Sequence, residues 1–114
     1  MKLHISPEIA RASYDRLRAV PPFHRWSLPP AEQVAFVVRP MRDSFAELEM
    51  DPERLYINTN RHSTLAALDV SLAHEMIHMR LFYVGMKNWN GHGAAFKTLA
   101  ERICRIHSWD IGAF

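Results

Sequence analysis

The sequence predicts a single α+β domain with one helix, a three-stranded antiparallel sheet and then two further helices. Apolar residues recur at helical spacing in residues 7–20, 63–84 and 92–107. Three short runs rich in β-branched and aromatic residues lie between positions 34 and 58. A length of 114 residues suffices for one hydrophobic core and not for two, so we take residues 1–114 as one domain.

The first helix is predicted over residues 7–20. Ser6 is suited to the N-cap, and Pro7 fits the first helical position because its missing N–H would have no partner there. Pro21 and Pro22 end the helix. Its predicted buried stripe contains Ile9, Ala10, Tyr14, Leu17 and Val20.

Strands are predicted at residues 34–38, 45–50 and 55–58. The first run, VAFVV, suits a buried strand, whereas FAELEM alternates apolar and polar residues as a strand with one solvated face does. Asp51 and Pro52 form a turn before the third run. The short connections favour an antiparallel meander.

The second helix is predicted from an N-cap at Ser63 or Thr64 to about Val84, with Gly85 as the stop. Leu68, Leu72 and Met76 mark one apolar stripe, and other apolar residues occupy another side of the same helix. Such a helix is expected to be buried. Polar side chains on it must therefore find a partner or a ligand, since an unpartnered buried polar group costs about 1–3 kcal/mol.

The last helix is predicted to begin near His92 and Gly93 and to continue to about His107. Cys104 lies on its apolar side and is expected to be a core residue. Because Cys104 is the only cysteine, the sequence contains neither a disulfide framework nor a four-cysteine zinc ribbon.

The second predicted helix contains the sequence His74-Glu75-Met76-Ile77-His78. Residues four apart share a helix face, so both imidazoles can bind one metal ion, with Glu75 beside them as a general base for a metal-bound water. The competing interpretation is a helix whose polar face carries these residues by chance. The apolar character of the helix favours the metal site.

A hydrolytic zinc site needs a third protein ligand. The metzincin pattern is excluded, because Val84 stands where its third histidine would be and Leu81 where its glycine would be. His92 and Glu101, which follow His78 by 14 and 23 residues, both remain open from spacing alone.

HEMIH, an interval of 13 residues, then His92-Gly93-Ala94-Ala95-Phe96 and Leu99 together resemble the SprT-like zinc metallopeptidase domain. The order of predicted elements and the Ile57-Asn58 strand end before the HExxH helix resemble it too. The resemblance extends from the first helix to about His107. It implies a zincin-like fold, one catalytic Zn²⁺ and His92 as the third ligand, with Glu101 outside the ligand set.

Many members of that family carry a cysteine zinc ribbon or nucleic-acid-binding extensions. This sequence resembles a minimal form without a C-terminal ribbon, so the action of some relatives on DNA-bound proteins is not carried over. The resemblance implies a catalytic core whose partner is a protein or peptide substrate.

The predicted activity is endopeptidase hydrolysis. His74, His78 and His92 would hold Zn²⁺, and Glu75 would activate the zinc-bound water. Four residues are open as stabilisers of the oxyanion: Tyr56, His62, Tyr83 and His107. An extended peptide would pair with an edge strand, for which residues 55–58 are the nearest candidate in sequence.

Charge and hydrophobicity limit which other functions the sequence allows. The net charge is only +2, although 11 of the 14 basic residues are arginine and six of them lie in the first 42 residues. A metal-stabilised protein- or nucleic-acid-binding module with little protease activity is therefore the alternative, and DNA association stays open. No apolar run suits a membrane span or a signal segment, so we expect a cytoplasmic protein; its oligomeric state is not predicted.

Overall fold

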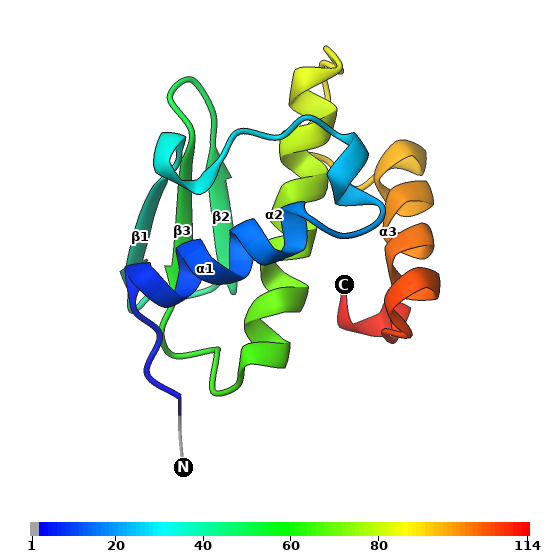
Figure 1. The fold of residues 1–114 in the computed structure, drawn as a ribbon. Coiled ribbons are helices and arrows are strands. Elements are labelled where there is room, and N and C mark those ends of the chain that lie inside the picture. The colour runs from blue at the N-terminus through cyan, green and yellow to red at the C-terminus, as the bar shows by residue number, and fades with distance from the viewer. Residues whose placement is uncertain (1–2) are drawn as a thin grey trace.

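The computed structural model describes residues 3–114 and has the predicted α+β architecture (Figure 1). The main elements are the helices α1 (Pro7–Arg18), α2 (Leu65–Tyr83) and α3 (Ala94–His107) and the strands β1 (Ala35–Arg39), β2 (Ala46–Glu49) and β3 (Arg54–Asn58). Three short 3₁₀ helices lie at Phe23–Arg25, Ala31–Gln33 and Ile111–Ala113.

Helix ends follow the local sequence signals. The Ser6 side chain accepts a hydrogen bond from the Ile9 amide at the start of α1, and the Thr64 side chain accepts one from the Ala67 amide at the start of α2. Thr64, not Ser63, is thus the N-cap. Gly85 has a φ of 85°, a left-handed conformation that glycine adopts without strain after a helix.

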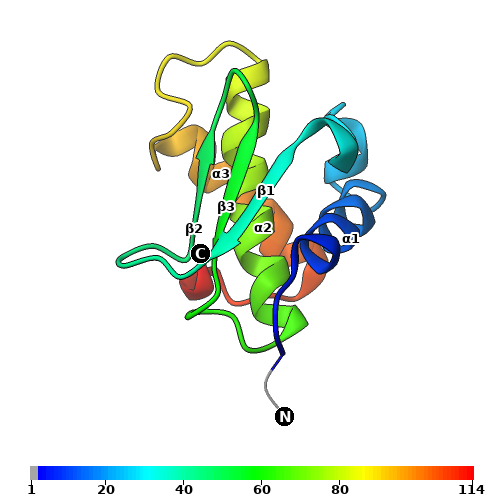
Figure 2. The ribbon, with the colours of Figure 1, turned by 90° about the vertical axis from the view of Figure 1, so that its left-hand side faces the viewer.

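The sheet is mixed, so the prediction of a purely antiparallel meander is wrong. The strand order is β1-β3-β2, in which β1 pairs parallel with β3 and β2 pairs antiparallel with β3 (Figure 2). The short turn between β2 and β3 makes those two antiparallel neighbours. β1 instead occupies the other side of β3, and this arrangement places residues 55–58 in the centre of the sheet.

The side chain of Asn58 forms hydrogen bonds with the loop that connects β1 to β2. Its side-chain amide donates to the carbonyl oxygens of Met41 and Ser44, and its side-chain oxygen accepts from the amides of Met41 and Asn60. Asn58 is fully buried at the end of β3. It therefore holds the loop that carries the chain around the end of the central strand.

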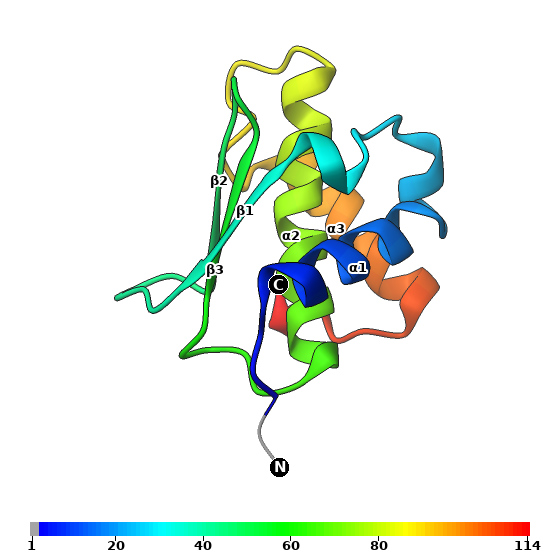
Figure 3. The same ribbon diagram turned by 60° about the vertical axis from the view of Figure 1, so that its left-hand side comes forward.

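Helix α2 lies at the centre of the molecule. The sheet covers one side of it, while α1 and α3 lie on the other side (Figure 3). Leu68, Leu72, Met76, Ile77 and Met79 have no exposed surface. The expectation of a buried helix is confirmed, although its first residue, Leu65, lies beyond the packed layers and is half exposed.

Helix α3 buries Phe96, Ala100, Ile103 and Cys104, so the prediction that Cys104 is a core residue is confirmed. After α3 the chain turns back and brings the Phe114 ring to 6.0 Å from the His74 ring, measured between centroids. No element was predicted for this segment. Within residues 3–114, no helix is both long enough and apolar enough to cross a membrane.

Candidate metal centre

Helix α2 presents His74, Glu75 and His78 within about one turn, and all three line a cleft together with residues of β2 and with His92 just before α3. Glu75 is 7 % exposed and His78 is 5 % exposed, while His74 is partly buried. These polar groups therefore lie in the interior of the molecule with one side open to a cleft.

The start of α3 brings a third imidazole to this pair. His92 Nε2 lies 3.1 Å from His74 Nε2 and 3.2 Å from His78 Nε2. Among residues 3–114, these three are the group of histidine, cysteine and acidic side chains that could hold a metal ion. Glu101, the other residue that spacing left open, is exposed on α3 and is not part of this group.

Phe96 supports all three rings. Its ring centroid lies 4.8 Å from those of His74 and His78 and 4.6 Å from that of His92. Phe96 itself is only 5 % exposed. The phenylalanine four residues after His92 is therefore the apolar surface on which the imidazoles pack.

A backbone contact orients His78. Its Nδ1 lies 2.8 Å from the carbonyl oxygen of Trp89, which can only accept, so Nδ1 carries the proton. The Nε2 lone pair of His78 is then directed at the cluster. Trp89 lies in the loop between α2 and α3, and the sequence contained no signal for this role.

His74 and His78 are held in the neutral form that binds metals. Burial, together with the neighbouring rings of His78 and His92, lowers the pKa of His74 from 6.5 to about 4, although a backbone hydrogen bond with Phe114 opposes the change. Burial also lowers the pKa of His78, although its hydrogen bond to Trp89 opposes the change. Near neutral pH both imidazoles therefore keep a free lone pair.

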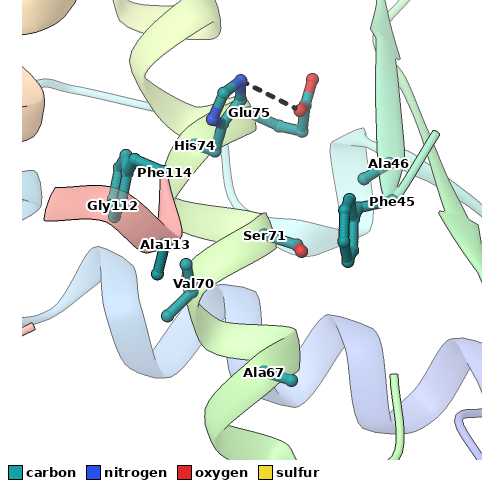
Figure 4. Close-up of a pocket in the computed structure, with 10 residues that line it drawn as sticks. All are labelled: Phe45, Ala46, Ala67, Val70, Ser71, His74, Glu75, Gly112, Ala113 and Phe114. Carbon is teal, nitrogen blue, oxygen red and sulfur yellow. Dashed lines mark ion pairs between the residues drawn. The ribbon is translucent and has the colours of Figure 1, made fainter. Parts of the chain in front are cut away.

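Glu75 is a buried residue whose carboxyl group makes no hydrogen bond within residues 3–114. Its Oε2 lies 3.9 Å from His74 Nε2, the contact marked by the dashed line in Figure 4, and this distance is beyond hydrogen-bond length. Burial, together with the nearby carboxylate of Glu47, raises the pKa of Glu75 from 4.5 to about 8. A group with this pKa can both accept and donate a proton near neutral pH.

A cleft of about 290 Å³ opens over the cluster. On one side it is lined by Ala46, Glu47 and Leu48 of β2, and on the other by His74, Glu75, His78, Trp89, Asn90 and His92. Sequence reasoning missed Glu47, Trp89 and Asn90, because strands and loops bring them to the site from outside the motif.

The four residues considered for the oxyanion do not line this cleft. The hydroxyl groups of Tyr56 and Tyr83 donate to Glu49 and Glu53 at the surface. His107 Nε2 lies 2.7 Å from the carbonyl oxygen of Pro21. His62 is buried, with its two ring nitrogens bound to Asn58 and Ser71.

Residues 55–58, the candidate nearest in sequence for an edge strand, offer no free edge, because β3 pairs on both sides. The strand beside the cleft is β2, which has β3 on one side only. Position in the sequence does not decide which strand lies beside the cleft.

Comparison with known protein families gives a match over residues 32–110, from just before β1 to the turn after α3. The matched family is described as the SprT-like family. Comparisons with curated proteins and with solved structures give no match. Since the matched residues cover more than half of the sequence and include the whole histidine cluster, the chain belongs to the SprT-like family.

Proposed function

We propose that the protein is a zinc-dependent endopeptidase. The observation that carries this proposal is the convergence of three imidazole nitrogens beside the buried side chain of Glu75, whose carboxyl group makes no hydrogen bond within residues 3–114. Membership of a family associated with zincin-like metalloprotease domains agrees with it.

The donor set fits zinc. Two nitrogen ligands at about 2.0–2.1 Å from a tetrahedral ion are about 3.3 Å apart. The two distances that His92 Nε2 makes, 3.1 and 3.2 Å, are close to this value. Three neutral imidazoles with an open side are typical of a catalytic rather than a structural zinc site.

When bound, zinc supplies a Lewis acid that polarises a carbonyl group and acidifies a water molecule. Glu75 then accepts the proton of the attacking water at a carboxylate oxygen and delivers it to the leaving amine. Its position beside the three imidazoles suits Glu75 to both steps, and a bound cation would favour the carboxylate form that accepts the proton.

The β2 edge is the proposed binding strand for the peptide. The backbone N–H of Asn58 donates to the carbonyl oxygen of Phe45. In an antiparallel pair every second residue is hydrogen-bonded to the neighbouring strand, so the backbone groups of Phe45 and Glu47 point toward β3. Ala46 and Leu48 alternate with them, and their backbone groups point away from β3. These groups lie at the cleft and are available to an extended substrate.

Asn90 is the proposed stabiliser of the oxyanion. It lines the cleft together with His78 and His92, and its side-chain amide is a neutral hydrogen-bond donor. We propose Asn90 for this role in place of the four residues that the sequence suggested, because their side chains form hydrogen bonds outside the cleft. Its position in the loop before α3 is set by the fold, not by the HExxH motif.

The test combines metal analysis with proteolysis. Purified protein should contain one zinc ion, and cleavage of unfolded casein should be abolished by a chelator and restored by zinc. Glu75→Gln should retain zinc and lose activity by at least about 100-fold. Zinc retention with no hydrolysis in the wild type, across a broad peptide library, would instead favour the metal-stabilised binding module.

The ligand assignment has its own matched pair of variants. His92→Ala should lose stoichiometric zinc, whereas Glu101→Ala, on the exposed side of α3, should retain it. The reverse result would show that the third ligand is misassigned.

A further inference from the structure

A second cavity adjoins the cleft and extends along the N-terminal half of α2. It measures about 570 Å³, within the range of about 300–1,000 Å³ that is typical of ligand sites. Figure 4 shows α2 as its floor, with Phe45 on the side of the sheet and Phe114 on the side of the C-terminal segment. Ala67 and Val70 contribute further apolar surface from α2.

We propose that this cavity, which we name the apolar pocket, binds a large apolar side chain of the substrate residue that immediately follows the cleaved bond. The inference rests on the proposed peptidase function and adds the class of substrate that the site prefers.

The chemistry of the lining supports an apolar ligand. Apart from His74 and Glu75, which the pocket shares with the cleft, the polar side chain that α2 contributes is Ser71, whose hydroxyl lies 2.8 Å from His62 Nε2. His62 Nδ1 must donate to the carbonyl oxygen of Asn58 at 2.7 Å, so Nε2 accepts and the Ser71 proton is already used. A charged side chain would therefore find no charged partner along Ala67, Val70 and Ser71.

The apolar pocket is continuous with the catalytic cleft. Ala46, His74 and Glu75 line both cavities, whereas His78 and His92 line only the cleft. The apolar pocket thus lies on the side of the cluster where Glu75 would protonate the leaving amine. The residue that carries that amine is the first one after the cleaved bond, so its side chain lies nearest to this pocket.

Strand direction leads to the same assignment. β2 begins at Ala46 beside the apolar pocket and continues to Leu48 and Glu49, which line a depression with Trp89. A peptide added antiparallel to β2, the commoner mode of pairing, runs from Trp89 toward the apolar pocket. Its residues after the cleaved bond then reach Val70 and Phe114.

The experiment uses peptide hydroxamates, in which the metal-binding group replaces the cleaved bond and the next residue is leucine, glycine or aspartate. Binding to zinc-loaded protein is measured by calorimetry. Burial of the leucine side chain should make that compound at least about 10-fold tighter than the glycine compound. The aspartate compound should be the weakest.

Two variants locate the effect. Val70→Lys should reverse the order of the leucine and aspartate compounds, and Ala67→Phe should remove the advantage of leucine by filling the pocket while sparing the glycine compound. Ala66→Lys is the matched control, because Ala66 is exposed on the same helix and does not line the pocket. It should leave all three affinities unchanged.

The outcomes separate the two proposals. Equal affinities for the three compounds, or discrimination that survives both pocket variants, would overturn the apolar pocket and leave the zinc site standing. Failure of every compound to bind, the glycine compound included, would overturn the proposed function and the inference with it.

Discussion

Replacing Glu75 by glutamine should change how the stability of the metal-free protein depends on pH. The glutamine side chain has nearly the same shape but does not titrate between pH 5 and pH 9. Glu75 is 7 % exposed and its carboxyl group makes no hydrogen bond within residues 3–114, so its ionised form is poorly solvated in the fold.

The size of the effect follows from the pKa of the carboxyl group, which rises from 4.5 to about 8 on folding. Folding therefore takes up a proton between these pH values. The resulting stabilisation is fully present below pH 4.5 and is lost as the pH rises through about 8. At about 1.4 kcal/mol per pH unit, the wild type should lose about 3–4 kcal/mol relative to Glu75→Gln between pH 5 and pH 8.

The measurement is urea denaturation of both proteins after removal of metal by a chelator, at intervals from pH 5 to pH 9. The histidines are common to both proteins, so their titration largely cancels in the difference. Added zinc should make the difference in free energy of unfolding between the two proteins depend less on pH, because a nearby cation favours the carboxylate. A difference between the two free energies of unfolding that stays constant with pH would refute the account of Glu75 as a destabilised buried carboxyl group.

Three further substitutions test other parts of the structure. Phe96→Ala should weaken zinc binding about 10- to 100-fold in a competition titration and lower the free energy of unfolding by about 3–5 kcal/mol, with Phe96→Leu much milder; unchanged zinc affinity would contradict the role of this ring. Asn58→Ala should cost at least about 2 kcal/mol in chemical denaturation, because it leaves backbone groups of the β1–β2 loop without partners, whereas Asn60→Ala should be nearly neutral. Asn90→Ala should lower kcat about 10²-fold with little change in zinc content, and an unchanged kcat would remove it as the oxyanion donor.

Local signals in the sequence were sufficient for the helices. Ser6 and Thr64 cap α1 and α2, Gly85 follows α2, and the apolar surface of α2 predicted its central position. These features depend on residues within a few positions of one another. They could be predicted because helix hydrogen bonds and caps are local.

The order of the strands could not be predicted in the same way. The runs that became β1, β2 and β3 were recognised, but their spacing contains no information on which strands pair. Asn58 decides this in part, since it binds the loop that crosses the end of β3, and its role depends on Met41 and Ser44. For the same reason the sequence could offer residues 55–58 only as a candidate edge strand, and the structure places them in the centre of the sheet.

By itself, the sequence determined that His74, Glu75 and His78 share one region of a buried helix, and its resemblance to a family pointed to His92. Only the tertiary structure decided what surrounds them: the Phe96 ring beneath the imidazoles, the Trp89 carbonyl that orients His78, the β2 edge and the apolar pocket. The physical reason is that helical periodicity places neighbours one turn apart, whereas contacts between elements depend on how whole faces pack. A motif can therefore name metal ligands, while the cleft that selects a substrate exists only in the folded chain.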